Sequence, residues 1–199
     1  KDRWLPGIRD GSVGWAQGYS EPGAGSDLAS LQFSAKLENG TYTLNGHKIW
    51  TSTAREAQMM FALIRTEPDA PKHEGISYLL IDMKSPGITV RPLRQMTGEA
   101  EFNEVFFTDT RIHQSEMLGS AGDGWRVSLT TLMNERQSIG GGMPARGSGT
   151  IAALTKAWEQ LPAERKNATA RDDVMRLWCR AEVVRLTNIR ANQNRKMGD

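Results

Sequence analysis

The order of apolar and polar residues divides the chain into two parts with different periods. From residue 13 to about 118, short runs either alternate apolar and polar residues or stay apolar throughout, which is typical of β-strands. From about residue 122 onward, apolar residues recur at helical spacing. The pattern predicts an α+β fold, with an antiparallel β-barrel or sandwich followed by long helices of an incomplete helical bundle.

The first part predicts short strands joined by turns. Residues 31–37 and 42–45 alternate, and Asn39-Gly40 between them is a strong hairpin signal. Asn45-Gly46 predicts a second turn. Further runs complete a set with the spacing of a barrel or sandwich, at 59–64, 76–81, 87–90 and 105–107.

The second part predicts long helices. Asp123 is a suitable N-cap for the first of them, which continues through Val127 and Leu132. The glycines at 140–142 and Pro144 would weaken an ordinary helix, at about 1 kcal/mol per glycine and about 3 kcal/mol for an interior proline. Helical spacing returns over 150–158 and again from about 168 to 196. Such helices cannot bury their apolar faces alone, so we expect partner helices from a longer chain or from a second subunit.

The composition limits the classes of protein to which the chain can belong. Hydrophobic residues make up 38% of the chain and charged residues 24%, as in globular proteins. A net charge of +2 without a block of Lys and Arg argues against nucleic-acid binding. No apolar run reaches 18 residues, so no membrane span is expected, and no metal site is predicted. The single cysteine, Cys179, excludes an internal disulfide and favours a reducing, cytoplasmic location. The charged start and the abrupt helical end lead us to expect that both ends are cut.

Three segments carry candidate chemistry. The loop at 17–27 contains three glycines and one proline, so its backbone N–H groups can approach a phosphate or the edge of a polar ring, although an ordinary surface turn has the same composition. In the segment 48–52, Trp50 ends a strand and can cover a flat cofactor, although a tryptophan there is more often part of a core. Glu135, among apolar helical positions, suits a general base, although Glu135-Arg136 alone is more often a solvated pair.

Taken together and in order, these segments resemble the acyl-CoA dehydrogenase family over roughly residues 14–199. The resemblance is carried by Ser-Glu-Pro-Gly-Ala-Gly-Ser-Asp at 20–27, by 45–52, by Ser-Pro-Gly-Ile at 85–88, by 104–112, and by Gly119, Gly122, Gly124 and Trp125. It implies that residues 1–13 end an N-terminal helical domain or linker, that 14–120 form the family's middle β-domain, and that 121–199 begin its C-terminal helical domain.

The resemblance also implies an activity. In the family, a carboxylate removes the α-proton of an acyl-CoA thioester, a hydride leaves the β-carbon for FAD, and a trans-2-enoyl-CoA forms. The electrons then pass to an electron-transfer flavoprotein, and the enzymes are dimers or tetramers. Carried over by position, the FAD-binding residues are Gln17, Tyr19, Ser20, Gly25, Ser26, Trp50, Thr51 and Ser52; those facing the substrate are Ser26, Met133, Asn134 and Arg136.

The catalytic base is a separate question. Most members carry it on a C-terminal loop that this chain lacks, but some, similar to isovaleryl-CoA and long-chain acyl-CoA dehydrogenases, place a Glu before an Arg on the first C-terminal helix. Glu135 occupies that position. The sequence departs from the family at Tyr19 and Thr51, where aliphatic residues are usual, and at Ser20 and Ser52, where Thr is common.

The sequence is also compatible with other functions. An acyl-CoA oxidase or a nitroalkane-type flavoenzyme has the same scaffold, and a subunit that binds no flavin would keep the β-domain. Because the family's complete site needs further helices and a neighbouring subunit, we expect these 199 residues alone to bind FAD weakly or not at all.

Overall fold

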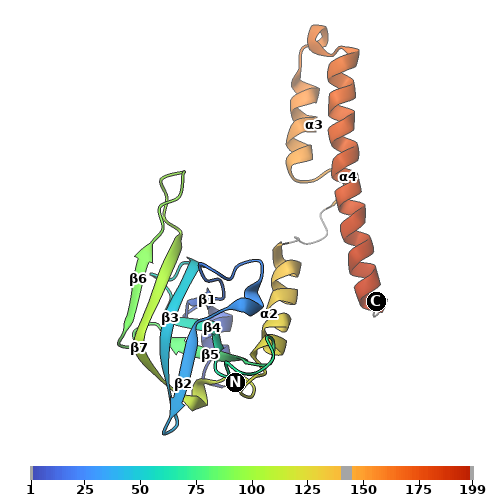
Figure 1. Ribbon diagram of the computed structural model, residues 1–199. Helices are drawn as coiled ribbons and strands as arrows, with labels where there is room; N and C mark the ends of the chain where they lie inside the picture. The colour runs from blue at the N-terminus through green and yellow to red at the C-terminus, as the bar shows by residue number, and fades with distance from the viewer. Residues whose placement is uncertain (1, 140–144, 198–199) are drawn as a thin grey trace. The chain divides into compact units, whose positions relative to one another are not determined.

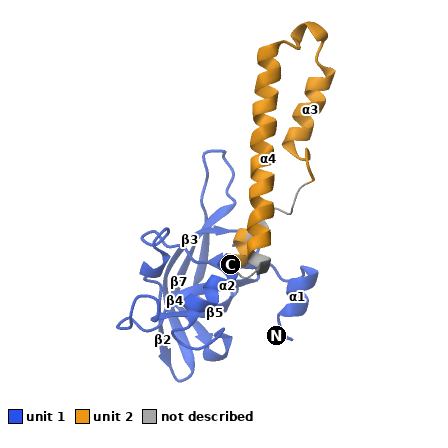
Figure 2. Ribbon diagram, turned by 90° about the vertical axis from the view of Figure 1, so that its right-hand side faces the viewer, with its two compact units in different colours: residues 1–132 blue, residues 133–199 orange. Residues whose placement is uncertain are grey.

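The computed structural model describes residues 2–139 and 145–197 (Figure 1). The chain forms two compact units, of which the first ends at Leu132 and the second begins at Met133 (Figure 2). The predicted weak point at 140–142 and Pro144 lies outside the described residues.

One curled sheet forms the first unit. In the part of the chain that the structure describes, the sheet has seven strands: six follow one another in the order β1-β4-β2-β3-β7-β6, and β5 pairs with β4. Their bounds are β1 (Trp15–Gly18), β2 (Ser34–Glu38), β3 (Thr41–Ser52), β4 (Met59–Arg65), β5 (Ile76–Asp82), β6 (Ile88–Pro92) and β7 (Phe102–His113). The α+β class is confirmed, but the sheet is mixed rather than purely antiparallel, because β1 pairs with β4 in parallel.

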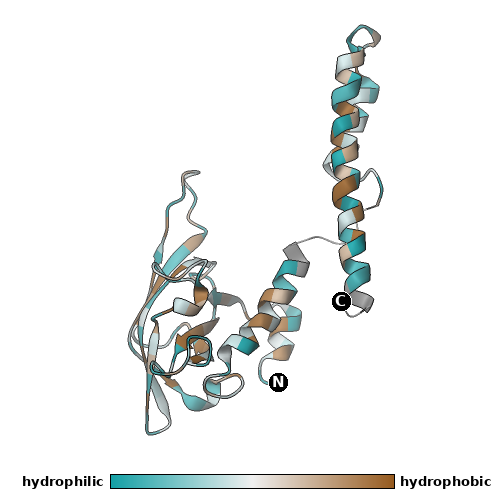
Figure 3. Ribbon diagram, turned by 45° about the vertical axis from the view of Figure 1, so that its right-hand side comes forward, coloured by the Kyte–Doolittle hydropathy of each residue, from teal (hydrophilic) through white to brown (hydrophobic). Residues whose placement is uncertain are grey.

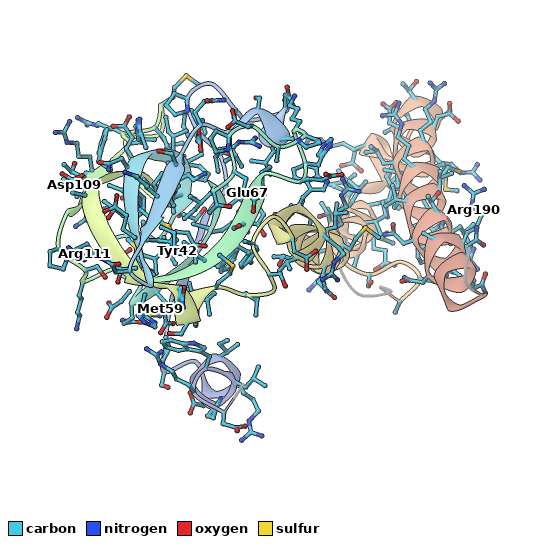
Figure 4. All side chains as sticks on the ribbon, turned by 60° about the horizontal axis from the view of Figure 1, so that its bottom comes forward. Tyr42, Met59, Glu67, Asp109, Arg111 and Arg190 are labelled. Carbon is cyan, nitrogen blue, oxygen red and sulfur yellow. The ribbon has the colours of Figure 1, made fainter. Side chains whose placement is uncertain are left out.

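Alternation along β3 and β7 gives the sheet an inner and an outer side. Leu44 and Val105 are fully buried, whereas Asp109 and Arg111 are exposed. In Figure 4 the Tyr42 side chain lies within the β-domain, and those of Asp109 and Arg111 lie at its outer side. The inner residues form one apolar core with β4 and β5, which is what a period of two predicts for a half-buried strand.

A second core lies on the other face of β4 and β5. Leu63 and Tyr78 pack there with Leu31, and the helix α2 (Gly124–Ile139) covers them with Trp125 and Val127. Both faces of β4 and β5 are therefore buried, which explains their nearly continuous apolar sequence.

Two local features differ from the sequence prediction. Asn45-Gly46 is not a turn but lies inside β3, at a shift in register against β7. Gly46 has φ 154°, and a Cβ there would lie 2.4 Å from Cδ2 of Phe33, so the glycine serves close packing. The predicted loop at 17–27 begins later than expected, because Gln17 and Gly18 belong to the short strand β1, which a short helix α1 (Leu5–Asp10) precedes.

The remaining helices follow the predicted ranges closely. α3 (Thr150–Gln160) and α4 (Ala168–Met197) pair in the second unit. The described residues also include short 3-10 helices at Leu28–Ser30, Gln114–Glu116 and Ala163–Arg165. Figure 3 shows apolar residues along α4. The exposed ones include Met175, Leu177, Val183, Val184 and Leu186. Of the described helices, none has the length and apolar character that crossing a bilayer requires.

Gly124 gives a test of how α2 is seated on the sheet. A Cβ on Gly124 would lie 2.4 Å from the backbone C and 2.7 Å from Cα of Ser77. Gly124→Ala should therefore push the start of α2 off β5 and lower the free energy of unfolding by about 1–3 kcal/mol, measured by urea denaturation. Gly23→Ala is the control, since no atom lies within 4 Å of its added Cβ. Equal midpoints for the two variants would contradict this account of the contact.

Candidate functional site

The glycine-rich loop meets the end of β3. The backbone N–H of Ile49 donates to the carbonyl oxygen of Ser20 at 2.9 Å. Ile49 is the residue before Trp50, so the backbone of Ser20 lies next to the residue that precedes Trp50. Two segments about thirty residues apart, singled out separately in the sequence, are therefore joined.

A buried ion pair fixes this junction. Nζ of Lys48 donates to Oε1 of Glu21 at 2.8 Å and to the carbonyl oxygen of Tyr19 at 3.0 Å. Lys48 is fully buried, and Glu21 is 8% exposed. The Glu21 carboxylate also accepts the backbone N–H groups of Gln32, at 2.6 Å, and Phe33, at 3.0 Å. Both charges are thus hydrogen-bonded as well as paired, which is what burial of a charge requires.

The pKa of Lys48 also departs from its ordinary value. Burial lowers the pKa of Lys48 to about 8, and the neighbouring Glu21 carboxylate opposes that shift. Both residues lie within the sequence motifs, but the sequence predicted no role for either. A lysine between a histidine and an isoleucine near a strand end carries no signal of burial, because most lysines are exposed.

Trp50 stands on a β-bulge. The register runs from Lys48 opposite Val105 to Thr51 opposite Asn103, so two residues of β3 face one residue of β7. Trp50 has φ 59°, a region that bulky residues rarely occupy. Its side chain is 58% exposed and meets the Phe102 ring edge-on at 6.0 Å between centroids. The alternative of an ordinary core tryptophan is therefore wrong, and a strained, exposed aromatic residue is a candidate for a functional position.

The loop beyond Ser20 is tight and open on its outer side. Glu21 and Ala24 exchange backbone hydrogen bonds of 3.0 and 3.1 Å around Pro22 and Gly23. An added Cβ at Gly25 would meet no atom within 4 Å, and Ser26 is exposed. Farther along, Nζ of Lys72 binds the Asp27 carboxylate at 2.6 and 2.8 Å. The loop is held at its base and its far end, and its glycine-rich tip is open to solvent.

The other sequence-predicted residues of the first unit divide into two groups. Gln17 and Ser20 are half-buried, and Ser52 is exposed beside Trp50. Tyr19 and Thr51, in contrast, have buried side chains. The Tyr19 ring packs edge-on against Phe61 and Tyr78 in the second core. The prediction that Tyr19 and Thr51 bind a cofactor therefore rests on their backbone groups.

Except for Ser26, the residues predicted to face the substrate belong to the second unit, as does the predicted base Glu135. Met133, Asn134 and Arg136 are exposed on α2, and Glu135 is half-buried. Glu135 follows Leu132 by three positions, which places both on one face of the helix. That Glu135 and the glycine-rich loop share one site stays a prediction. Among the described residues, no cluster of His, Cys, Asp or Glu is arranged to hold a metal ion.

Comparison with known proteins assigns the family. Residues 16–110 match the family model described as acyl-CoA dehydrogenase, middle domain. The acyl-CoA dehydrogenase IpdE1 of Mycobacterium tuberculosis is 52% identical over 134 residues, which are 67% of this chain and 35% of that protein. The chain belongs to the acyl-CoA dehydrogenase family. The matched residues 16–110 of this middle domain include both partners of the buried Glu21–Lys48 pair.

Further relatives agree with this assignment. The acyl-CoA dehydrogenase FadE34 of Mycobacterium tuberculosis is 48% identical over 71% of this chain and 20% of its own length. The solved structure entitled Tcur3481-Tcur3483 steroid ACAD superimposes with a TM-score of 0.82 at 31% identity, over 95% of this chain and 48% of that chain. The chain thus spans about a third or less of these curated relatives and about half of the solved one.

The buried pair gives the stability of this chain a specific pH dependence. In the folded protein Lys48 loses its proton at about pH 8, whereas in the unfolded chain it does so at the ordinary value of 10.5. Between these values the unfolded state binds more protons, so the free energy of unfolding contributed by Lys48 rises with pH. Lys48→Met removes this titration and leaves Glu21 unpaired, at a cost of about 3–5 kcal/mol.

The expected result is that wild type and Lys48→Met are already separated at pH 7 and that the gap widens up to about pH 10, measured by chemical denaturation at a series of pH values. Lys36→Met is the matched control, because Lys36 pairs with Glu38 on the surface with 81% of its side chain exposed. Parallel profiles for wild type and Lys48→Met would contradict the burial of a charged Lys48.

Proposed function

We propose that this chain is part of an enzyme that desaturates an acyl-CoA thioester between its α- and β-carbons with FAD, giving a trans-2-enoyl-CoA. The observation that carries the proposal is the Ile49–Ser20 hydrogen bond. It joins the glycine-rich loop at 17–27, called the Ser20 loop from here on, to the Trp50 bulge. A flat cofactor needs an aromatic cover and polar donors at its edge, and these two segments offer both side by side.

The residues present fit an isoalloxazine ring. Trp50 offers an exposed indole on a bulge that is fixed on both sides. Ser52, two residues on, and Ser20 offer hydroxyl donors, and Gly25 leaves room for close approach of backbone N–H groups. None of these groups is charged, which suits a neutral ring with several hydrogen-bonding atoms. Gln17 lies half-buried on the strand that leads into the loop and adds a further amide.

The reaction needs a base and an acceptor. Bound FAD supplies the acceptor for the hydride that leaves the β-carbon of the substrate. Glu135 takes the α-proton onto its carboxylate, and the electron pair of that C–H bond becomes the new double bond. Because the α-proton is a weak acid, hydrogen-bond donors at the thioester oxygen and exclusion of water must stabilise the developing enolate. Arg136, Asn134, Met133 and Ser26 are the residues we assign to hold the acyl-CoA.

The electron acceptor, the assembly and the acyl group are proposed from the relatives. We assign an electron-transfer flavoprotein as the electron acceptor and a dimer or tetramer as the active assembly. Support for a steroid-derived thioester comes from the neighbour entitled Tcur3481-Tcur3483 steroid ACAD, at 31% identity. Fatty and branched acyl groups are the alternatives, and the helices that shape the acyl pocket decide among them.

The direct test uses the full-length enzyme under anaerobic conditions. We expect the purified protein to be yellow and its flavin absorbance to bleach with at least one of a steroid-side-chain, a branched and a straight-chain acyl-CoA. Rapid reoxidation by an electron-transfer flavoprotein and slow reoxidation by oxygen would identify a dehydrogenase, and the reverse would identify an oxidase. A colourless protein, or absorbance unchanged by every thioester in the panel, would overturn the proposal.

Glu135→Gln tests the base. The amide keeps the shape of the side chain but cannot accept the α-proton, so flavin reduction by saturating substrate should slow by about 10²–10⁴-fold, measured by stopped-flow absorbance. FAD content should stay unchanged. Glu159→Gln, an exposed glutamate on α3, is the matched control and should reduce at the wild-type rate. A near-normal rate for Glu135→Gln would place the base elsewhere in the protein.

A further inference from the structure

A buried asparagine lies across the sheet from the Trp50 bulge. Asn103 of β7 is 1% exposed and pairs in register with Thr51 of β3. Its side-chain Nδ2 donates to the carbonyl oxygen of Thr51 at 3.0 Å and to that of Glu101 at 3.1 Å. The two amide hydrogens therefore bridge the backbone of β3 just after Trp50 to the backbone that leads into β7.

The bulge needs such a support. Trp50 has φ 59° and Thr53 has φ 53°, so two residues close together occupy the left-handed region. Each such residue costs about 1–3 kcal/mol and persists only where its surroundings determine the backbone. On the N-terminal side, the Ile49–Ser20 hydrogen bond and the buried Lys48 hold β3 in place. On the C-terminal side, the backbone N–H of Thr53 donates to the carbonyl oxygen of Glu101 at 3.1 Å, and the Asn103 amide donates to that oxygen and to the carbonyl oxygen of Thr51.

Stability alone does not explain an asparagine at this position. Oδ1 of Asn103 and Oγ1 of Thr51 are buried and have no hydrogen-bond partner within the part of the chain that the structure describes. A buried polar atom without a partner costs about 1–3 kcal/mol, and a pair of apolar residues of similar shape would avoid this cost. Asn103, unlike an apolar residue, donates hydrogen bonds to the two carbonyl oxygens.

We propose that Asn103 is a positioning residue that holds the Trp50 bulge in the geometry that receives the flavin. That a flavin binds at the bulge rests on the proposed function. That Asn103 holds the bulge, which we call the Asn103 clamp, rests on its hydrogen bonds to Thr51 and Glu101. Asn103 acts through the backbone of β3. Its effect on the cofactor should therefore pass through Trp50 and disappear when the indole is removed.

Hydrogen exchange tests the clamp without reference to the cofactor. In the full-length protein, Asn103→Leu keeps the volume but loses both donors, and amide protons of residues 49–53 should exchange about tenfold faster, as expected for the loss of about one hydrogen bond. Thr110→Val is the control, because Thr110 is also fully buried on β7 with a hydroxyl that lacks a partner among the described residues. Unchanged protection over 49–53 in Asn103→Leu would overturn the clamp. If circular dichroism shows Asn103→Leu to be unfolded, Asn103→Ser, which keeps one donor, takes its place.

FAD binding tests the link to Trp50. Asn103→Leu should raise the FAD dissociation constant about tenfold, whereas in a Trp50→Ala background it should change it less than twofold. Equal factors in the two backgrounds would show that Asn103 acts on stability in general and would refute the positioning role. If the wild-type enzyme binds no FAD, the proposed function fails, and the exchange experiment still decides whether Asn103 clamps the bulge.

Discussion

The hydrogen-bonded ion pair between Glu21 and Lys48 is the interaction on which the candidate site depends. Glu21 follows Ser20 in the loop, and Lys48 precedes Trp50 by two residues in β3, so one buried contact fixes both segments. The carboxylate is bound by two backbone N–H groups, and the ammonium also binds a carbonyl oxygen. Breaking a buried pair leaves an uncompensated charge, so the two segments are expected to move together or not at all.

This constraint explains how a strained residue is kept at the surface. Trp50 occupies an unfavourable backbone conformation on a bulge and leaves most of its ring in solvent, which no folding argument favours. Buried polar contacts hold the strand before and after it, through Lys48 and through Asn103. A rigid first contact surface is what a cofactor site needs, because ordering it on binding would cost affinity. The strain and the buried polar groups thus have a common explanation in the placement of one aromatic ring.

Sequence patterns predicted much of this fold and part of the site. Periods of two and 3.6 located most strands and the long helices, and the motifs at 20–27 and 45–52 identified the family. The patterns failed where long-range contacts decide. Asn45-Gly46 has the sequence of a turn but lies within β3 because Phe33 packs onto the glycine. In sequence, nothing distinguishes Lys48, Glu21 and Asn103 from ordinary surface residues. Only the folded structure reveals that they are buried and hydrogen-bonded to backbone groups.

The proposed site requires that the Ser20 loop and the Trp50 indole contact the same flavin ring. A crystal structure of the full-length enzyme with FAD bound measures this most directly. The account predicts that the Trp50 ring covers the isoalloxazine at van der Waals distance, about 3.5–4 Å, while Ser20 lies within hydrogen-bonding reach of its edge. An isoalloxazine that contacts only one of the two segments, or neither, would contradict it.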